Sequence, residues 1–328
     1  MLTAAPRAPY SEGEMTARND GANDSANDLA RAQRDALLQL AARRAKTDGT
    51  TETAIPFLSL LRSAKPTPLS HGILQPSMCL VVQGDKQLMV GAETYRYGAG
   101  WYVMSALEFP VAGHIVRASQ ATPYLAVRVT FDVRELADVI VEAELTERET
   151  APAGPAVIVG AADPRMLGCL LRLVQLLDEP DGGAFLAPAV QRELIYRLLR
   201  SERGGLILRS VKPANLGVGR AIDYLRRHFA QAIDIAALAR TSRMSVSGLR
   251  HEFKAATALA PLQFQKQLRL QEARRLLMAG EVDAGTAAFR VGYESPSQFS
   301  REYRRMFGAP PIRDIRKLAG AASLGASS

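Results

Sequence analysis

Two short segments near the end of the chain carry polar side chains at a spacing that suits contact with DNA bases. If both are helical, one face of the first presents Ser247, Arg250, His251 and Lys254, and one face of the second presents Ser297, Gln298, Arg301 and Arg305. Arg forms a bidentate pair with guanine in the major groove, Gln pairs similarly with adenine, and Ser can serve several bases. We therefore predict that these eight residues contact DNA, and a solvated surface role is the alternative for each.

The elements that would hold these side chains have the outline of two helix-turn-helix units, at residues 234–257 and 283–308. Each reads as a short Ala-rich helix, a tight polar turn and a second helix that is apolar on one side only. A helix over residues 262–279 is expected to join them. Eighteen residues at ~1.5 Å each span roughly 27 Å, and adjacent major grooves lie ~34 Å apart. With the thickness of the flanking units, one chain can therefore reach two adjacent grooves.

The positive charge of the chain is concentrated in the same region. Residues 212–318 contain 19 Lys and Arg against 9 Asp and Glu, a net charge of +10, whereas the other residues contain 22 against 24. Basic side chains supply the salt-dependent part of nucleic-acid binding. The charge distribution therefore indicates a polyanionic partner, double-stranded DNA, for the C-terminal part.

The composition excludes several other classes of protein. No apolar run approaches the ~18 residues of a membrane span, and the N-terminus lacks the pattern of a secretion signal. Cys79 and Cys169 form neither a disulfide framework nor a CxxC metal site, which indicates the reducing cytoplasm. His71 and His114 are single and far apart, so no metal site is expected. No catalytic motif and no phosphate-binding loop are present, and neither an enzyme nor a bound cofactor is predicted.

The chain is predicted to be an α+β protein. We expect a disordered tail at residues 1–28, a regulatory and dimerisation domain at 29–210, a DNA-binding domain at 211–318 and a flexible tail at 319–328. A leading helix is expected from Leu29 to Lys46, ended by the stretch TDGTTET. Short β-rich runs with regular turns between about Ile55 and Asp132 then indicate a cupin-like barrel or jelly roll. Stretch 204–217, rich in Gly and Pro, is interpreted as the boundary between the two domains.

Two helices with apolar stripes are predicted after the β-rich region, at about residues 162–180 and 188–204. Their apolar faces suit either of two roles. They can cover the barrel of the same chain, or they can pair between subunits in a homodimer.

Three residues of the β-rich region are candidates for sensing a signal. Cys79 lies in the apolar run MCLVV, where a thiol of lowered pKa could react with an electrophile or an oxidant; its alternative role is that of a small buried apolar side chain. Trp101 and His114 are candidates for lining an effector pocket, although aromatic residues in a β shell more often belong to the core.

Three motifs in sequence order carry a resemblance to a known family. They are IAALARTSRMSVSGLRHEFK, PLQFQKQLRLQEARRLL and VGYESPSQFSREYRRMFGAPPIRDIR. Together they resemble the DNA-binding domain of AraC/XylS-type bacterial transcription regulators. The runs PSMCLVVQGDKQLMVG, YRYGAGWYVMSALEFPV and PYLAVRVTFD are similar to the β-rich regulatory domain of one subgroup of these regulators.

This resemblance implies a cytoplasmic transcription regulator that responds to an unknown small-molecule effector or reactive species. It also implies RNA polymerase as a partner, homodimerisation through the N-terminal half, and base reading from the recognition-helix positions given above. Two residues depart from the family pattern. Ala258 stands where a C-cap glycine is usual, and Gly285 stands where a helix former is common.

Two other functions stay open at this point. One is a constitutive DNA-binding protein with a cupin-like ligand-binding module. The other is a cupin-like enzyme with a DNA-targeting tail.

Overall fold

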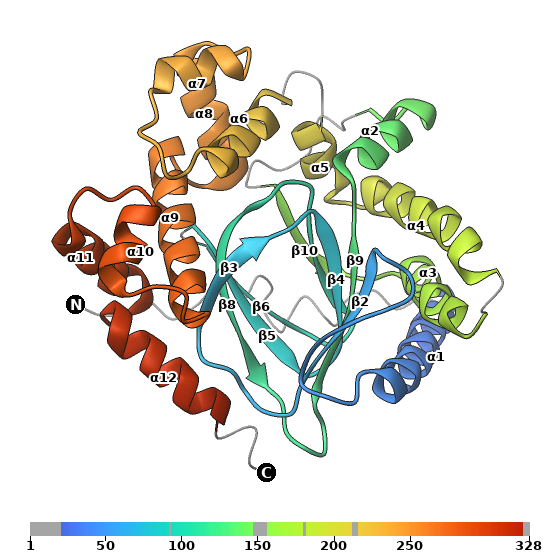
Figure 1. Ribbon diagram of the computed structural model, residues 1–328. Helices are drawn as coiled ribbons and strands as arrows, with labels where there is room; N and C mark the ends of the chain where they lie inside the picture. The colour runs from blue at the N-terminus through green and yellow to red at the C-terminus, as the bar shows by residue number, and fades with distance from the viewer. Residues whose placement is uncertain (1–20, 92, 147–155, 180–181, 212–215, 324–328) are drawn as a thin grey trace. The chain divides into compact units, whose positions relative to one another are not determined.

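The computed structural model describes residues 21–91, 93–146, 156–179, 182–211 and 216–323. The chain divides into two compact units. The N-terminal unit comprises residues 1–215 with 256–258, and the C-terminal unit comprises residues 216–255 with 259–328 (Figure 1).

Two antiparallel sheets form the centre of the N-terminal unit. The six-stranded sheet has the order β1-β2-β9-β4-β7-β10 and the four-stranded sheet the order β3-β8-β5-β6. The strands of the six-stranded sheet are β1 (Gly49–Glu52), β2 (Leu58–Ser63), β4 (Ser77–Gln83), β7 (Trp101–Ser105), β9 (Tyr124–Thr130) and β10 (Val157–Ala161). Those of the four-stranded sheet are β3 (Ser70–Leu74), β5 (Asp85–Val90), β6 (Glu93–Gly98) and β8 (Phe109–Arg117). This is the cupin-like arrangement expected from the sequence, as two sheets rather than one closed barrel.

Strand β4 shows why the central strands are continuously apolar. Six consecutive residues from Ser77 are buried, because both faces of the six-stranded sheet are covered. Met78, Leu80 and Val82 belong to the hydrophobic core shared with the helices. The alternate residues Cys79 and Val81 point to the other face, since side chains alternate along a strand.

Three helices cover the outer face of the six-stranded sheet. They are α1 (Gly21–Arg44), α3 (Pro164–Gln175) and α4 (Gly183–Arg200), seen beside β2, β4 and β9 in Figure 1. Leu37 of α1, Leu170 of α3 and Leu194 of α4 are fully buried in the core that they share with the sheet. The apolar stripes of the last two helices therefore cover the sheet of their own chain, and pairing between subunits stays a prediction. The short helices η2 (Leu176–Asp178), α2 (Val133–Glu142) and α5 (Gly204–Val211) complete the unit.

The structure corrects several boundaries that were predicted from the sequence. Helix α1 begins at Gly21, so residues 21–28, which were expected to be disordered, are helical. Residues 1–20 lie outside the described residues. At the other end, α12 (Pro311–Ser323) continues through residues 319–323, which were expected to be a flexible tail; residues 324–328 are not described.

Three predicted irregular or helical stretches have a different structure. The stretch that ends the first helix contains β1, which pairs with β2 from Gly49 to Glu52. The residues just before the first predicted helix, which were not expected to form a strand, contain β10, which pairs with β7 as an edge strand. The predicted domain boundary begins with α5, in which Leu206, Ile207 and Leu208 are buried in the N-terminal core. In each case pairing or burial supplied by distant residues outweighs the local signal.

The C-terminal unit is helical, as expected. It contains α6 (Leu216–Arg227), α7 (Ile235–Thr241), α8 (Val246–Thr257), α9 (Pro261–Met278), α10 (Ala284–Arg290), α11 (Pro296–Phe307) and α12. Helix α9 runs between the group α6–α8 and the group α10–α11 (Figure 1). Among the described helices of the whole chain, none combines the length and the apolar character that crossing a membrane requires.

Candidate nucleic-acid interface

The first helix-turn-helix unit consists of α7 and α8. The carboxylate of Asp234 caps α7 by accepting hydrogen bonds from the backbone N–H groups of Ala236 and Ala237, at 2.9 and 3.2 Å. The hydroxyl of Ser245 caps α8 by accepting from the N–H of Gly248 at 3.0 Å. Each cap satisfies backbone donors that the helix leaves without a partner. The caps therefore define where the short first helix and the recognition helix begin.

The second unit repeats this design with α10 and α11. Asp283 caps α10 by accepting from the N–H of Thr286 at 2.7 Å, and this hydrogen bond lowers the pKa of Asp283. Ser295 caps α11 through the N–H of Gln298, Pro296 occupies the first turn, and Gly308 closes the helix at a φ of +80°. Ser followed by Pro at the start and Gly after the end are typical helix caps.

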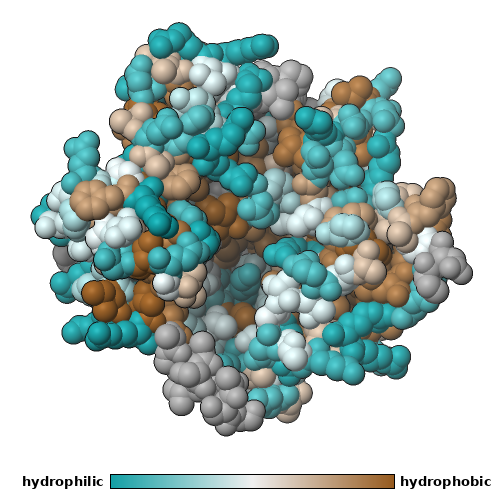
Figure 2. Space-filling model, in the orientation of Figure 1, coloured by the Kyte–Doolittle hydropathy of each residue, from teal (hydrophilic) through white to brown (hydrophobic). Residues whose placement is uncertain are grey.

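The predicted base-contacting residues are all exposed on the two recognition helices. Ser247, Arg250, His251 and Lys254 lie on α8, and Ser297, Gln298, Arg301 and Arg305 lie on α11. Within the described residues, no ion pair involves any of the four Arg and Lys side chains among them. Hydrophilic residues predominate on the visible surface around α7 (Figure 2). The Arg and Lys side chains that would meet DNA are therefore solvated and available.

The opposite faces of both recognition helices are buried, which fixes the exposed faces. In α8, Leu249 and Phe253 are fully buried, and the Phe253 ring meets Phe264 of α9 edge-on at 5.3 Å between centroids. In α11, Phe299 and Tyr303 are fully buried. Aromatic pairs of this geometry contribute beyond the area they bury.

Arg269 of α9 connects the two helix-turn-helix units. Its guanidinium donates hydrogen bonds of 2.6–3.2 Å to four backbone carbonyl groups, those of Phe229, Ala230, Gln231 and Gly292. The first three precede α7, and Gly292 lies in the turn between α10 and α11. Burial lowers the pKa of Arg269. Its hydrogen-bond acceptors are all neutral carbonyl groups. One side chain of the linking helix therefore holds loops of both helix-turn-helix units.

Gly292 allows this close approach of the two loops. Its φ is +87°, and a Cβ atom at this position would lie 1.9 Å from the carbonyl oxygen of Ala230. Both the left-handed backbone and the lack of space require glycine here.

Asp314 anchors α12 to the rest of the C-terminal unit. Its carboxylate accepts a bidentate pair of hydrogen bonds from Arg274 at 2.8 and 3.0 Å, and another from the hydroxyl of Tyr303 at 2.8 Å. The Arg274 guanidinium also lies 4.5 Å from the centre of the Phe307 ring. Burial and the Asp314 carboxylate raise the pKa of Tyr303, which keeps its hydroxyl protonated as a donor. This network was not predicted from the sequence, because its members are spread over three helices.

Two positions in the first helix-turn-helix unit, Arg243 and Ala258, adopt the left-handed conformation without glycine. Arg243, in the turn between α7 and α8, has a φ of +56°, whereas Gly292 fills the equivalent turn of the second unit. Ala258, after α8, has a φ of +60°, whereas Gly308 follows α11. The departure noted at Ala258 is therefore a strained C-cap.

The candidate sensing residues of the N-terminal unit are not gathered in one place. Cys79 lines a cavity of about 220 Å³ between the two sheets, whereas Trp101 and His114 are not among the side chains that line it. His114 lies on the opposite face of β8 from Gly113, which does line the cavity. Burial raises the pKa of the Cys79 thiol despite the nearby positive charges of Lys86 and Arg128. A raised pKa disfavours the reactive thiolate, so the structure supports the alternative of a buried apolar side chain.

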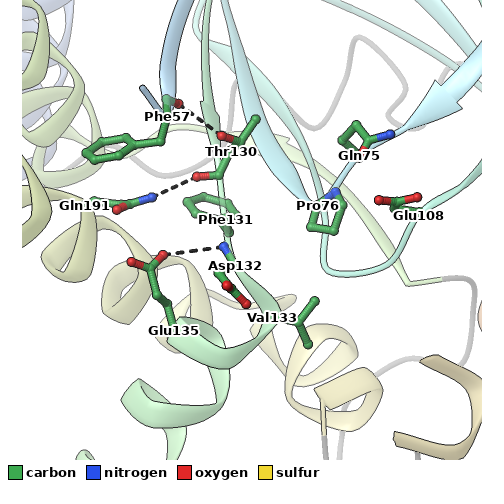
Figure 3. A pocket seen from close by; sticks show the side chains of 10 residues that line it. All are labelled: Phe57, Gln75, Pro76, Glu108, Thr130, Phe131, Asp132, Val133, Glu135 and Gln191. Atoms are coloured by element: carbon green, nitrogen blue, oxygen red, sulfur yellow. Dashed lines mark hydrogen bonds between the residues drawn. The ribbon is translucent and has the colours of Figure 1, made fainter. Parts of the chain in front are cut away.

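A second pocket of about 620 Å³ lies near the end of β9 (Figure 3). On one side, Gln191 of α4 donates a hydrogen bond of 2.8 Å to the carbonyl of Thr130, and Glu135 accepts one from the N–H of Asp132. The Glu108 carboxylate lies on the other side (Figure 3). The polar groups that Figure 3 connects complete the strand end and the cap of α2, so they serve the fold. Among the described residues, no group of three or more His, Cys, Asp or Glu side chains could hold a metal ion.

Comparison with known proteins assigns both parts of the chain. Residues 54–206 match the model of the AraC-type transcriptional regulator N-terminus, and residues 238–317 match a helix-turn-helix domain model. The HTH-type transcriptional activator RhaS of Escherichia fergusonii is 30% identical over 156 residues, which are 47% of this chain and 56% of that protein. RhaS of Escherichia coli strain SE11 is 29% identical over 147 residues, 44% of this chain and 52% of the relative. The chain thus spans about half the length of the curated relatives it matches.

Solved structures share the fold over most of the chain. ToxT of Vibrio cholerae O395 has a TM-score of 0.51 at 11% identity, over 80% of this chain and 98% of ToxT. ToxT bound to (E)-4-(8-methylnaphthalen-1-yl)but-3-enoic acid has a TM-score of 0.52 at 13% identity, over 79% of this chain and 97% of ToxT.

Proposed function

We propose that this chain, which belongs to the AraC family of transcription regulators, regulates transcription by binding a specific DNA sequence. The observation that carries the proposal is the pair of capped recognition helices, α8 and α11, each with a buried apolar face and an exposed polar face. Arg269 connects both units to the same linking helix. Two recognition helices that are connected in this way suit binding in two adjacent major grooves on one side of the duplex.

In this proposal the exposed residues of the recognition helices have different tasks. Arg250 and Arg301 pair with guanine, Gln298 pairs with adenine, and Ser247 and His251 supply further hydrogen bonds to base edges or phosphates. Arg304 and Lys317 are also exposed, and we assign them to phosphates, where contacts position the protein without reading sequence.

We further infer that the N-terminal unit binds a small-molecule effector that modulates this activity. The proposal is supported by the match to the regulatory domain of the family and by the cavity between the sheets. RNA polymerase and a second copy of the chain are proposed partners, as expected of a transcription regulator. The site of action would be the bacterial cytoplasm, where the chromosome lies. An enzymatic role has no support from the relatives, which are transcription activators by name.

Selection of genomic fragments tests this function. The full-length protein is incubated with sheared genomic DNA, and the retained fragments are sequenced. The proposal predicts a shared sequence motif in the retained fragments; retention without any common motif would contradict it. Repeating the selection with added cell extract distinguishes effector-dependent binding, which changes the retained amount, from constitutive binding, which does not.

A further inference from the structure

The cavity between the two sheets of the N-terminal unit is lined by basic side chains from both sheets. Lys86 enters from β5 of the four-stranded sheet and Arg128 from β9 of the six-stranded sheet. No Asp or Glu side chain is among the described residues that line this cavity of about 220 Å³. Both side chains are only partly buried, and two positive charges without a carboxylate among the lining residues favour binding of an anion there.

Strand register shows how the polar groups share the space. Lys86 lies directly opposite Tyr97 across the β5–β6 pair, and Arg128 lies directly opposite Cys79 across the β4–β9 pair. Directly opposed residues project from the same face of their sheet. The four-stranded sheet therefore supplies the Lys86 ammonium and the Tyr97 hydroxyl, and the six-stranded sheet supplies the Arg128 guanidinium and the Cys79 thiol.

The charges of these two cations are only partly compensated within the protein. Arg128 donates from Nε to the hydroxyl of Ser59 at 3.0 Å, which orients the guanidinium, and its Nη2 lies 3.6 Å from the exposed carboxylate of Glu52. Within the described residues, Lys86 forms no ion pair and no side-chain hydrogen bond. The ammonium group is therefore available for an anion.

Tyr97 provides an independent indication of a ligand. It is 4% exposed, and its hydroxyl has no hydrogen-bond partner among the described residues. Burial raises the pKa of Tyr97 well above its usual value, so the hydroxyl stays a donor. A buried donor without a partner costs free energy that a ligand oxygen would recover.

The rest of the lining limits the size and polarity of the ligand. Leu88, Val103 and Val111 are apolar and lie beside the polar groups. The volume is below the roughly 300–1,000 Å³ of pockets for drug-sized ligands. The ligand therefore needs one anionic end and a short hydrocarbon body.

We propose that the cavity binds a small monocarboxylate, with the carboxylate held by Lys86, Arg128 and the Tyr97 hydroxyl and the hydrocarbon against the aliphatic lining. This inference rests on the proposed function, in which the N-terminal unit is the effector-binding part of the regulator. It specifies the chemical class of that effector.

Calorimetric titration of the full-length protein with matched acids and amides tests the proposal. The probes are pentanoate, pentanamide, benzoate and benzamide, because each amide keeps the shape of its acid without the charge. At least one acid is expected to bind at least tenfold more tightly than its amide. Lys86→Met should remove this preference, whereas Lys65→Met, which changes an exposed lysine of the same unit, should retain it. Tyr97→Phe should weaken binding of the acid by roughly two- to tenfold, because one hydrogen bond is lost.

Several results would overturn the proposal. These are equal binding of acid and amide, no binding of either acid up to roughly 10 mM, or an unchanged preference in Lys86→Met. Binding of inorganic phosphate in place of both acids would also contradict the carboxylate assignment. DNA binding is measured on the same samples with a fragment selected as above. Loss of the carboxylate result with intact specific DNA binding refutes only this inference, whereas absence of specific DNA binding refutes the proposed function.

Discussion

Exposed basic residues of the C-terminal unit differ in what they are placed to contact. Arg250 lies in the first half of α8, where a recognition helix meets base edges, whereas Lys317 lies on α12, outside both recognition helices. Arg250→Ala is expected to weaken binding to the specific site by about 1–3 kcal/mol and to relax the preference at one base pair. Lys317→Ala is expected to weaken binding to all sequences alike. Titrations with the selected site and with scrambled DNA measure both effects; equal losses on both DNAs for Arg250→Ala would refute base reading by this residue.

The residues after the two recognition helices, Ala258 and Gly308, both have a left-handed backbone. Exchanging alanine and glycine at these positions is therefore expected to change stability in opposite directions. Ala258 bears the conformational cost that Gly308 avoids at the matching position, and that cost is about 1 kcal/mol for a residue with a Cβ. Ala258→Gly is therefore expected to raise the free energy of unfolding by up to about 1 kcal/mol, and Gly308→Ala to lower it by a similar amount. Chemical denaturation of both variants provides the measurement. Destabilisation by Ala258→Gly would show that the strain is compensated by contacts of the methyl group.

At the scale of elements, the contact between the loops of the two helix-turn-helix units is expected to control whether both units bind one DNA site at the same time. Gly292→Ala places a methyl group against the Ala230 carbonyl, so the loops held by Arg269 must separate. We expect this variant to lose at least tenfold in affinity for the complete site while each half of the site loses less. Gly285→Ala is the matched control, because its new Cβ has ordinary space, 3.5 Å from the nearest atom. Equal losses on complete and half sites would indicate that the loop contact does not set the spacing.

The buried pair of Arg274 and Asp314 is expected to be essential for docking α12. Their side chains are 11% and 7% exposed, and removal of one partner leaves a buried charge without compensation. Asp314→Asn should therefore destabilise the C-terminal unit by about 3–5 kcal/mol. The double variant Arg274→Met with Asp314→Asn should be more stable than Asp314→Asn alone. Thermal unfolding followed by circular dichroism measures this, and a single variant as stable as the parent protein would contradict the assignment.

The sequence predicted those elements whose signals are local. Recognition helix α11 was predicted from its one-sided apolar pattern, and its Ser-Pro start and terminal glycine are further signals that act within the same helix. Strand β10 was not predicted, because VIVGA is a short apolar run and only pairing with β7 makes it a strand. The β-rich runs predicted between 78 and 132 contain the six strands β4 to β9, and turn residues bound these runs.

The candidate sites were predictable to the same limited extent. The exposed residues of α8 and α11 follow from helical periodicity, which places them opposite buried residues of the same helix. Lys86 and Arg128 were not recognised, because they are 42 positions apart and only the two facing sheets bring them to one cavity. Cys79 was recognised by its chemistry, but its raised pKa depends on burial by distant residues.

For the whole molecule, the central claim is that one chain reads two adjacent major grooves. Its C-terminal part has the net positive charge that DNA binding requires, and α9 provides 18 residues, about 27 Å, between the two readers. The two recognition helices must then contact base pairs separated by about one helical turn, roughly 10–10.5 base pairs.

Base-pair substitution across the selected DNA site, measured with the full-length protein and with its Arg250→Ala and Arg301→Ala variants, tests this claim most directly. Each variant should become indifferent to substitutions at its own position, and the two positions should lie about 10–10.5 base pairs apart. Loss of discrimination at the same base pairs in both variants, with both proteins folded, would contradict the account.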